Sequence, residues 1–461
     1  MKIAVVGSGI AGLASAWLLS QQHEVVLFEA NDYLGGHTHT HDIELSHGRY
    51  QVDTGFIVHN PQHYPLLTRL FDTLGVATRA TTMSFSVRNE ASGLEYNTTT
   101  LDTLFCQRRN LVSPRFWGML RDLVRFYRSA PALLDIAGEG PTLGDYLVEG
   151  RYGDAFRDEH LVPMASALWS SPSTRILRFP AKYLVQFMAN HHMLQLTGRP
   201  EWRVVRGGSQ RYVDALRDSW RVQVRLRAPV RMALRDDDGV LVVSEGADGR
   251  GERFDHLVLA CHSDQALRIL GDDASDAEHD VLGAMPYQVN DTVLHTDARL
   301  LPRERKAWAA WNASVPRDPA EVCTVSYCMN LLQGIASPEP FVVTLNRTDA
   351  IDPAKVLRRM RYEHPVYSHA SVAAQQRKAQ IQGARRTWFA GAYWGWGFHE
   401  DGMRSAVQVA NALGVDWPVR QGGTHAPAGD AQAHPQAQPR PRTDTDDRSN
   451  DRASTLKGLP K

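Results

Sequence analysis

The sequence lacks several features that would assign it at once to a class such as membrane proteins or nucleic-acid-binding proteins. It has no run of eighteen consecutive apolar residues, which argues against a membrane-spanning helix. It has no excess of either charge, because 51 Lys and Arg residues balance 51 Asp and Glu residues. Net charge therefore gives no reason to expect nucleic acid as a partner. The 461 residues are enough for two domains with large cores, and we expect an ordinary globular enzyme.

Cysteine is also scarce. The four cysteines, Cys106, Cys261, Cys323 and Cys328, lack the paired spacing of a zinc site or a CxxC redox motif. So few thiols in so long a chain are typical of a reducing compartment. We therefore expect small buried side chains in a cytoplasmic protein.

The C-terminal segment lacks aliphatic residues. Residues 421–461 are rich in Gly, Ala, Pro, Gln, Asp and Arg, and Leu456 is the first leucine in the segment. Such a composition cannot bury enough apolar surface to offset chain entropy. We predict a disordered tail there. Its charges nearly cancel, which argues against an arm that binds nucleic acid.

Glycine is present where it carries information. Residues 3–12, IAVVGSGIAG, lead from an apolar run into Gly7, Gly9 and Gly12, and Glu29 ends a second apolar run, VVLFE. Three such glycines permit a tight turn, a close approach of the backbone to a pyrophosphate and close packing of a helix on a sheet. The helix N-terminus favours the anion, and the acid suits an adenosine ribose. A secretory leader is the alternative, but no cleavage site follows.

Two later stretches look like returns to the same domain. Residues 202–261 predict a helix, a strand, a hairpin with the turn DDDG and a buried strand. Residues 385–414 predict a strand, a glycine-rich loop and a helix that ends at Gly414. The pattern predicts an α/β fold with a doubly wound, Rossmann-like nucleotide-binding domain and a discontinuous α+β substrate domain. The expected boundaries are 1–75, 201–275 and 380–415 for the first, and 76–200 and 276–379 for the second.

Three signatures resemble the flavin-containing amine oxidase superfamily over about residues 1–415. They are the GSGIAG turn with the Gly-Gly of LGGHTHT, the Asp-x-Gly of VDTGF, and FAGAYWGWGFHEDGMRSA. The resemblance implies a FAD-dependent oxidoreductase in which one cofactor is contacted along its whole length. The residues expected to contact FAD are Gly7, Gly9, Ile10, Ala11, Gly12, Glu29, Ala30, Gly35, Gly36, His37, Thr38, Asp53, Thr54, Gly55, Val230, Gly391, Asp401, Gly402 and Met403.

A narrower resemblance concerns a bacterial family of predicted NAD/FAD-binding, amine-oxidase-like proteins. It rests on the phrases PMASALWS, FPAKYL, WRVVRGGS, HPVY and GFHEDGMRSA. Members of that family are associated with cyclopropane-fatty-acid synthases, which implies a fatty-acid-modifying enzyme as a partner. We expect hydride removal from an apolar lipid or fatty-acyl substrate. Alternatives are amine oxidation, flavin-dependent isomerisation or a desaturase partner role, and a non-catalytic FAD-binding scaffold.

Three departures from the superfamily pattern limit what the resemblance implies. His37 stands where many members have an arginine near the pyrophosphate. Asn290 or Asp291 stands where several amine oxidases have a lysine that holds water near the flavin, which weakens the amine-oxidase hypothesis. The C-terminal flavin segment has no cysteine, so we expect non-covalent FAD.

Catalytic candidates come mostly from the glycine-rich loop. Trp396 and Phe398 are candidates to line a substrate channel, with core packing as the alternative. His399, with Glu400 beside it, is a candidate proton acceptor, although a structural hydrogen bond is at least as good an explanation. His191 lies in the apolar segment FMANHHML, where a polar cluster serves either the substrate or the core.

Alternating histidines in HTHTH, which include His37, would share one face of an extended strand. Their place after the Gly-Gly pair favours contact with the cofactor over a metal, and we expect no metal. Residues 108–128 interleave arginines with apolar residues, as in a helix that lies on an anionic membrane. A surface helix with its apolar stripe in the core is the favoured interpretation, and peripheral contact with the inner membrane face is the alternative.

Overall fold

The computed structural model describes residues 1–418 except 170–172, 196–197, 199, 246–250 and 319–322. The predicted tail at 421–461 lies outside the described residues. Met1–Pro418 forms one compact unit by its internal contacts, and the domain boundaries expected from the sequence remain a prediction. Among the described residues, no helix is both long enough and apolar enough to span a bilayer.

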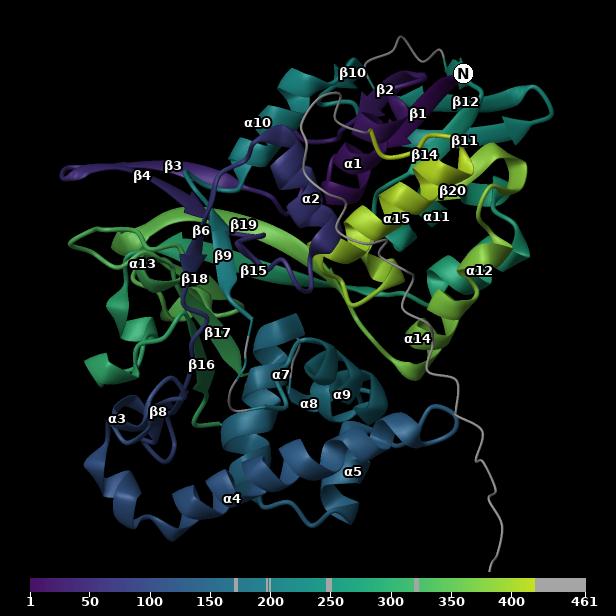
Figure 1. The fold of residues 1–461 in the computed structure, drawn as a ribbon. Coiled ribbons are helices and arrows are strands. Elements are labelled where there is room, and N and C mark those ends of the chain that lie inside the picture. The colour runs from purple at the N-terminus through teal and green to yellow at the C-terminus, as the bar shows by residue number, and fades with distance from the viewer. Residues whose placement is uncertain (170–172, 196–197, 199, 246–250, 319–322, 419–461) are drawn as a thin grey trace, which may run out of the picture. The chain divides into compact units, whose positions relative to one another are not determined.

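A five-stranded parallel sheet is built from three separate stretches of the chain (Figure 1). Its order is β10 (Val222–Arg225), β2 (Glu24–Phe28), β1 (Lys2–Val6), β14 (His256–Leu259) and β20 (Thr387–Phe389). The chain winds outward from β1 in both directions, so the topological switch point lies between β1 and β14. This doubly wound order confirms the predicted fold class, and ligands bind at such a switch point.

Two helices that begin at glycine-rich turns pack together beside this sheet. They are α1 (Ile10–Leu19) and α15 (His399–Ala412). All of α1 is buried, because its small residues allow close contact on every side. At Gly12 an added Cβ would lie 1.8 Å from the Gly7 carbonyl oxygen, and at Gly402 it would lie 2.7 Å from Ile10 Cγ2. The spacing of glycines is therefore dictated by packing as well as by the turn.

A smaller antiparallel sheet follows β10. It consists of β11 (Val230–Asp236), β12 (Gly239–Ser244) and β13 (Glu252–Phe254), and the first two form the predicted hairpin. The prediction of a helix from residue 202 was wrong at its start. Trp202–Val205 is strand β9, and α10 begins only at Gln210, because Gly207 and Gly208 both take positive φ and turn the chain.

The second large sheet has seven strands and is mainly antiparallel. Its order is β19 (Val356–Pro365), β15 (Tyr287–His295), β18 (Val342–Leu345), β17 (Thr324–Cys328), β16 (Trp311–Val315), β7 (Phe85–Asn89) and β8 (Glu95–Asn97). Helices α4 (Pro114–Ser129), α7 (Val162–Trp169) and α9 (Ala181–Asn190) share an apolar cluster with one end of this sheet. On α4 the predicted core stripe is confirmed, with Phe116, Met119, Leu123 and Phe126 buried.

The remaining elements connect these layers. Two small sheets are β3 (Thr40–Leu45) with β4 (Gly48–Asp53), and β5 (Val58–His59) with β9 and β6 (Thr78–Thr81). The other helices are α2 (Pro65–Leu74), α3 (Leu101–Leu104), α5 (Leu143–Glu149), α6 (Asp154–Phe156), α8 (Ser173–Leu177), α10 (Gln210–Ser219), α11 (Ser263–Leu270), α12 (Asp276–Gly283), α13 (Met329–Leu332) and α14 (His369–Gln376).

Candidate functional site

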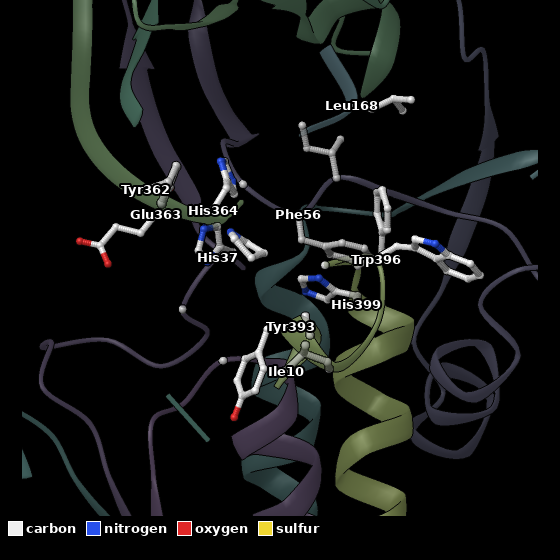
Figure 2. A pocket seen from close by; sticks show the side chains of 18 of the residues that line it. Ile10, His37, Phe56, Leu168, Tyr362, Glu363, His364, Tyr393, Trp396 and His399 are labelled. Carbon is white, nitrogen blue, oxygen red and sulfur yellow. The ribbon is translucent and has the colours of Figure 1, made fainter. Parts of the chain in front are cut away.

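A single large cavity of about 1000 Å³ runs from the nucleotide-type sheet to the helices around α4. Its lining includes the turn after β1, the end of β14, strand β19 and the loop before α15. In Figure 2, Ile10 and His399 come from the helix N-termini, His364 from β19 and Leu168 from α7. The site therefore lies where the switch-point rule places a ligand.

The turn after β1 leaves room for an anion. Gly7 has φ +99°, which few other residues tolerate. Gly9 has an ordinary extended conformation, yet no described heavy atom lies within 4 Å of where its Cβ would be. Its missing side chain opens onto the cavity. The N-terminus of α1 has no side-chain cap, so its free N–H groups face a space that a pyrophosphate fits.

Glu29 follows β2 and lines the same part of the cavity. One carboxylate oxygen accepts hydrogen bonds from the Ser8 backbone N–H (2.9 Å) and hydroxyl (2.6 Å). The other accepts from the Asn31 backbone and side-chain amides, at 2.8 and 2.9 Å. These four bonds hold the carboxylate in one orientation at the cavity wall, as the predicted contact with a ribose requires.

The Asp-x-Gly segment, Asp53 to Gly55, packs next to the cavity wall and supports it. Asp53 is fully buried and accepts hydrogen bonds from the Ser209 backbone N–H and hydroxyl, from Gln333 and from Thr40. Burial raises the pKa of its carboxyl to about 6. Gly55 lines the cavity, and a Cβ there would lie 2.0 Å from the His37 carbonyl oxygen. Asp53 is not among the residues that line the cavity, and it supports the wall by holding neighbouring segments through these hydrogen bonds.

The loop before α15 is held by one carboxylate. Asp401 is buried and accepts hydrogen bonds from the backbone N–H groups of Trp396 (3.0 Å) and Phe398 (3.1 Å). Arg404 donates to its other oxygen at 2.9 Å. Tyr183 donates to the Gly395 carbonyl at 2.9 Å. These bonds fix the backbone of the loop, and Trp396 and Phe398 are both among the residues that line the cavity.

His399 is neutral in this setting. Its ring stacks on Phe56 at 3.7 Å, and its Nε2 lies 3.0 Å from the Thr38 hydroxyl and 3.3 Å from the Tyr212 hydroxyl. Burial lowers the pKa of His399 to about 3. Such a weak base is a poor proton acceptor near neutral pH, so the geometry favours the structural alternative. Glu400 caps α2, where it accepts from the N–H groups of Leu66 and Leu67.

A second histidine on the wall has its tautomer set by a chain of amides. The Asp291 backbone N–H donates to Asn346 Oδ1 (3.0 Å), so Asn346 Nδ2 must be the donor to Asn290 Oδ1 (2.7 Å). Asn290 Nδ2 then donates to His364 Nδ1 (2.8 Å). His364 therefore carries its proton on Nε2. Burial lowers its pKa to about 4, which keeps it neutral.

His37 faces this group. Its ring centre lies 5.2 Å from that of His364, 5.1 Å from Tyr362 and 6.3 Å from His262. Burial and then the nearby imidazoles hold its pKa well below the usual range. Its Nε2 is buried with no hydrogen-bond partner among the described residues, which marks a place for a polar group of a ligand. Figure 2 shows His37 and His364 side by side.

His191 lies where the cavity passes toward the helices. Its ring is 4.0 Å from Phe187, which stacks on Phe398 at 5.2 Å. Its Nδ1 donates to the Phe187 carbonyl at 2.8 Å, and burial lowers its pKa to about 4. Trp396 packs edge-on against it at 5.9 Å. These four rings form an aromatic neck, defined as His191, Phe187, Trp396 and Phe398.

Beyond the neck the cavity becomes an apolar arm. Its side chains come from β7, β8, α3, α4, α7, α9 and the segment just after α9, and they belong to one apolar cluster. The arm is lined by Phe85, Tyr96, Leu104, Leu120, Leu123, Tyr127, Met164, Leu168, Phe187 and Met193. The described residues of this arm include no carboxylate.

The predicted contact residues divide between the cavity surface and the layer behind it. Those that line the cavity are Gly7, Gly9, Ile10, Ala11, Glu29, Ala30, Gly36, His37, Thr54, Gly55, Val230 and Gly391, with His191, Trp396, Phe398 and His399. Those outside its described lining are Gly12, Gly35, Thr38, Asp53, Asp401, Gly402 and Met403. These residues lie behind the described lining, and their role as direct contacts stays a prediction.

Comparison with known proteins agrees with this geometry. Residues 10–294 match the family described as flavin containing amine oxidoreductase, which is more than half of the chain. The protein belongs to this family. As a member of the flavin amine oxidoreductases it is an FAD-dependent oxidoreductase.

Individual relatives of this family member differ in what they act on. The carotenoid phi-ring synthase of Streptomyces griseus is 28% identical over 287 residues, which cover 58% of this chain and 53% of that protein. The chain thus spans about half the length of that curated relative. Cyclohexylamine oxidase from Brevibacterium oxydans IH-35A has a TM-score of 0.63 at 18% identity, covering 89% of this chain and 98% of its own. A CLA-producing fatty acid isomerase from P. acnes has a TM-score of 0.62 at 16% identity, covering 90% and 98%.

The residues that line the nucleotide end of the cavity fit FAD. The open space at Gly9, the uncapped α1 and the oriented Glu29 suit its pyrophosphate and ribose, and the unpartnered His37 Nε2 suits a further polar contact. Cys261 also lines the cavity, where burial raises the pKa of its thiol to about 12. Such a thiol is unreactive at neutral pH, in keeping with the expectation of non-covalent FAD.

The histidines of HTHTH do not lie as expected. His41 alone lies in strand β3, His37 turns toward His364, and the rings of His39 and His41 are tilted with their centres 4.0 Å apart. The three do not share a face, and the described residues hold no group of three or more side chains arranged for a metal. Sequence reasoning missed His364 as a wall residue, although the phrase HPVY that contains it carried the family resemblance.

Proposed function

We propose that this flavin amine oxidoreductase removes a hydride from a lipid or fatty-acyl chain. The apolar arm is the observation that carries this proposal. An ammonium group taken from water needs a carboxylate partner. The described cavity lining contains only Glu29 and Glu363 as carboxylates. Glu29 lies at the nucleotide end, where the cofactor ribose is expected, and Glu363 lies 3.2 Å from His262.

The chain's own residues would have three tasks. A bound flavin supplies the hydride acceptor. The aromatic neck would hold the reacting carbon and exclude water, because its rings pack against one another between the two halves of the cavity. His364 would offer a fixed Nε2–H to a cofactor or substrate oxygen, since Asn290 occupies its other nitrogen. The apolar arm would bind the tail of the substrate.

Anaerobic mixing tests the substrate class. The flavin-loaded protein is mixed with an unsaturated fatty acid, with putrescine or with cyclohexylamine, and the flavin absorbance is followed. We expect the fatty acid to bleach the flavin and the amines to leave it oxidised. Bleaching by the amines alone would contradict the proposal in favour of amine oxidation. Conversion of the lipid without bleaching would replace net oxidation by isomerisation, and no change in either would favour the scaffold alternative.

A matched pair of variants tests the arm itself. Leu168 lines the arm, so Leu168→Trp should fill it and slow reduction by the fatty acid at least about tenfold. Leu331 is 43% exposed and outside the described lining, so Leu331→Trp makes the same change harmlessly. Both variants should keep full flavin content. Equal rates in the two would place the lipid elsewhere. The expected association with a fatty-acid-modifying enzyme stays a prediction.

A further inference from the structure

The outer side of α4 exposes large apolar side chains. Trp117 is 50% exposed, and its indole N–H donates to the Leu111 carbonyl at 2.9 Å, which holds the ring in place at the surface. Leu111 and Val112, just before the helix, are 48% and 82% exposed. Exposed apolar groups that lie together in this way mark an interaction surface. We call Leu111, Val112, Trp117, Arg121 and Arg128 the α4 outer face.

The charge of this region differs from that of the chain. Residues 98–130 contain six arginines and two aspartates, whereas the whole chain is balanced. One of the aspartates, Asp122, is buried. Arg125 is used internally, where it donates to the Gly150 carbonyl (2.8 Å) and stacks on Tyr152. Arg121 is 78% exposed, and Arg128 has no ion pair with any described residue. The outer face is therefore both apolar and cationic.

The outer face also adjoins the cavity. A shallow surface hollow runs along α4 and is lined by Trp117, Leu120, Arg121, Val124, Arg125, Arg128 and Ser129. Leu120 lines the apolar arm as well, together with Leu123 and Tyr127. Leu120 thus borders both the hollow and the apolar arm. In Figure 1, α4 lies below α7 and α9, on the other side of them from the five-stranded sheet.

We propose that the α4 outer face docks on an anionic phospholipid bilayer and that an acyl chain passes Leu120 into the apolar arm. Tryptophan favours the membrane interface, and arginines near the surface gain from anionic lipid. The exposed apolar residues Leu111 and Val112 lie beside a cationic helix face, and such an arrangement suits shallow insertion of their side chains into the bilayer interface. The docking stands on the exposed residues alone. The passage of substrate rests on the proposed function.

Vesicle co-sedimentation of the full-length, flavin-loaded protein tests the docking. Vesicles of phosphatidylcholine are compared with vesicles that also contain phosphatidylglycerol. We expect binding to the anionic vesicles that weakens as salt is added. Arg121→Glu with Arg128→Glu should weaken it at least about tenfold. Arg217→Glu with Arg359→Glu changes the net charge equally on other surfaces and should leave binding within about twofold.

The outcomes separate the two parts of the proposal. Equal binding by the two double variants, or no preference for anionic vesicles, overturns docking by the α4 outer face. Leu120→Trp tests the passage, because it should leave vesicle binding and flavin content intact. It should slow flavin reduction by vesicle lipid at least about fivefold. An unchanged rate overturns the passage. If vesicles bind as expected while no lipid reduces the flavin, the proposed function fails and the docking stands.

Discussion

The two halves of the cavity are held in different ways. At the nucleotide end, buried carboxylates and amides fix each wall segment, as Asp401 does for the loop before α15 and Asn290 does for His364. Around the apolar arm, side chains of the same apolar cluster such as Phe126 and Leu184 are fully buried and held by packing. A polar network fixes the orientation of the groups that line a site, whereas packing fixes the volume of the space that they enclose. The first suits a cofactor with fixed contacts, and the second suits a flexible chain.

The largest expected effect is the loss of stability in acid, because the titratable groups concerned lie mainly at the nucleotide end of the cavity. His364, with a pKa of about 4, and His399, with a pKa of about 3, stay neutral in the fold, whereas in the unfolded chain they titrate near the ordinary value of about 6.5. As pH falls below about 6.5 the unfolded state binds more protons, so the free energy of unfolding decreases. Asp53 and Glu400 oppose this, because their pKa values are raised to about 6 and about 7.

His41, His59, His191 and His295 also have pKa values that burial lowers to about 4, so they add to the effect of His364 and His399. We therefore expect the histidines together to dominate, with a loss of about 5 kcal/mol or more in the free energy of unfolding between about pH 7 and about pH 5. Urea unfolding at several pH values measures it, and flavin fluorescence should report release of the cofactor first. Stability that rises on acidification would mean that Asp53 and Glu400 outweigh the histidines.

The next effect compares alanine substitutions at two glycines, Gly9 at the nucleotide end and Gly118 in α4. Gly9→Ala adds a Cβ where no described atom lies within 4 Å and where the backbone already suits alanine, so the fold should persist. The same Cβ would enter the space assigned to the pyrophosphate. FAD affinity should fall about a thousandfold, or about 4 kcal/mol. Gly118→Ala in α4 meets equally open space and should leave FAD affinity unchanged. Titration with FAD measures both, and tight binding by Gly9→Ala would refute the assigned position.

The smallest of the three effects is expected from aspartate truncation. Asp401→Ala leaves the N–H groups of Trp396 and Phe398 buried without an acceptor, which should cost about 3 kcal/mol and reduce flavin content. Asp122→Ala in α4 removes the acceptor of one backbone N–H, that of Gly153, and the ion-pair partner of Arg121 and Arg125. It should cost about half as much, with flavin content intact. Denaturation and flavin absorbance measure the two. Similar flavin losses would show that the halves are not independent.

Much of the nucleotide end could be predicted from the sequence. The glycine turn, Glu29 and the strand, loop and helix near the C-terminus each follow from local patterns, because backbone turns and helix starts depend on neighbouring residues. The stripe on α4 was equally readable, since helical spacing separates its buried Phe116 and Phe126 from its exposed arginines. The wrong start of the helix before residue 210 shows the limit, because adjacent glycines ended a strand instead.

By itself the sequence determined that the chain begins with a dinucleotide-binding turn, because the glycines and the acid act through short-range backbone chemistry. The choice of FAD came from the later signatures, through their resemblance to a flavoprotein superfamily. Only the tertiary structure decided which of the predicted residues line the cavity and which, like Asp53 and Asp401, stand behind it. It also brought His37 to His364, more than three hundred residues away in the chain. Such contacts depend on how β19 and the first sheet pack together, and no local pattern encodes that distance.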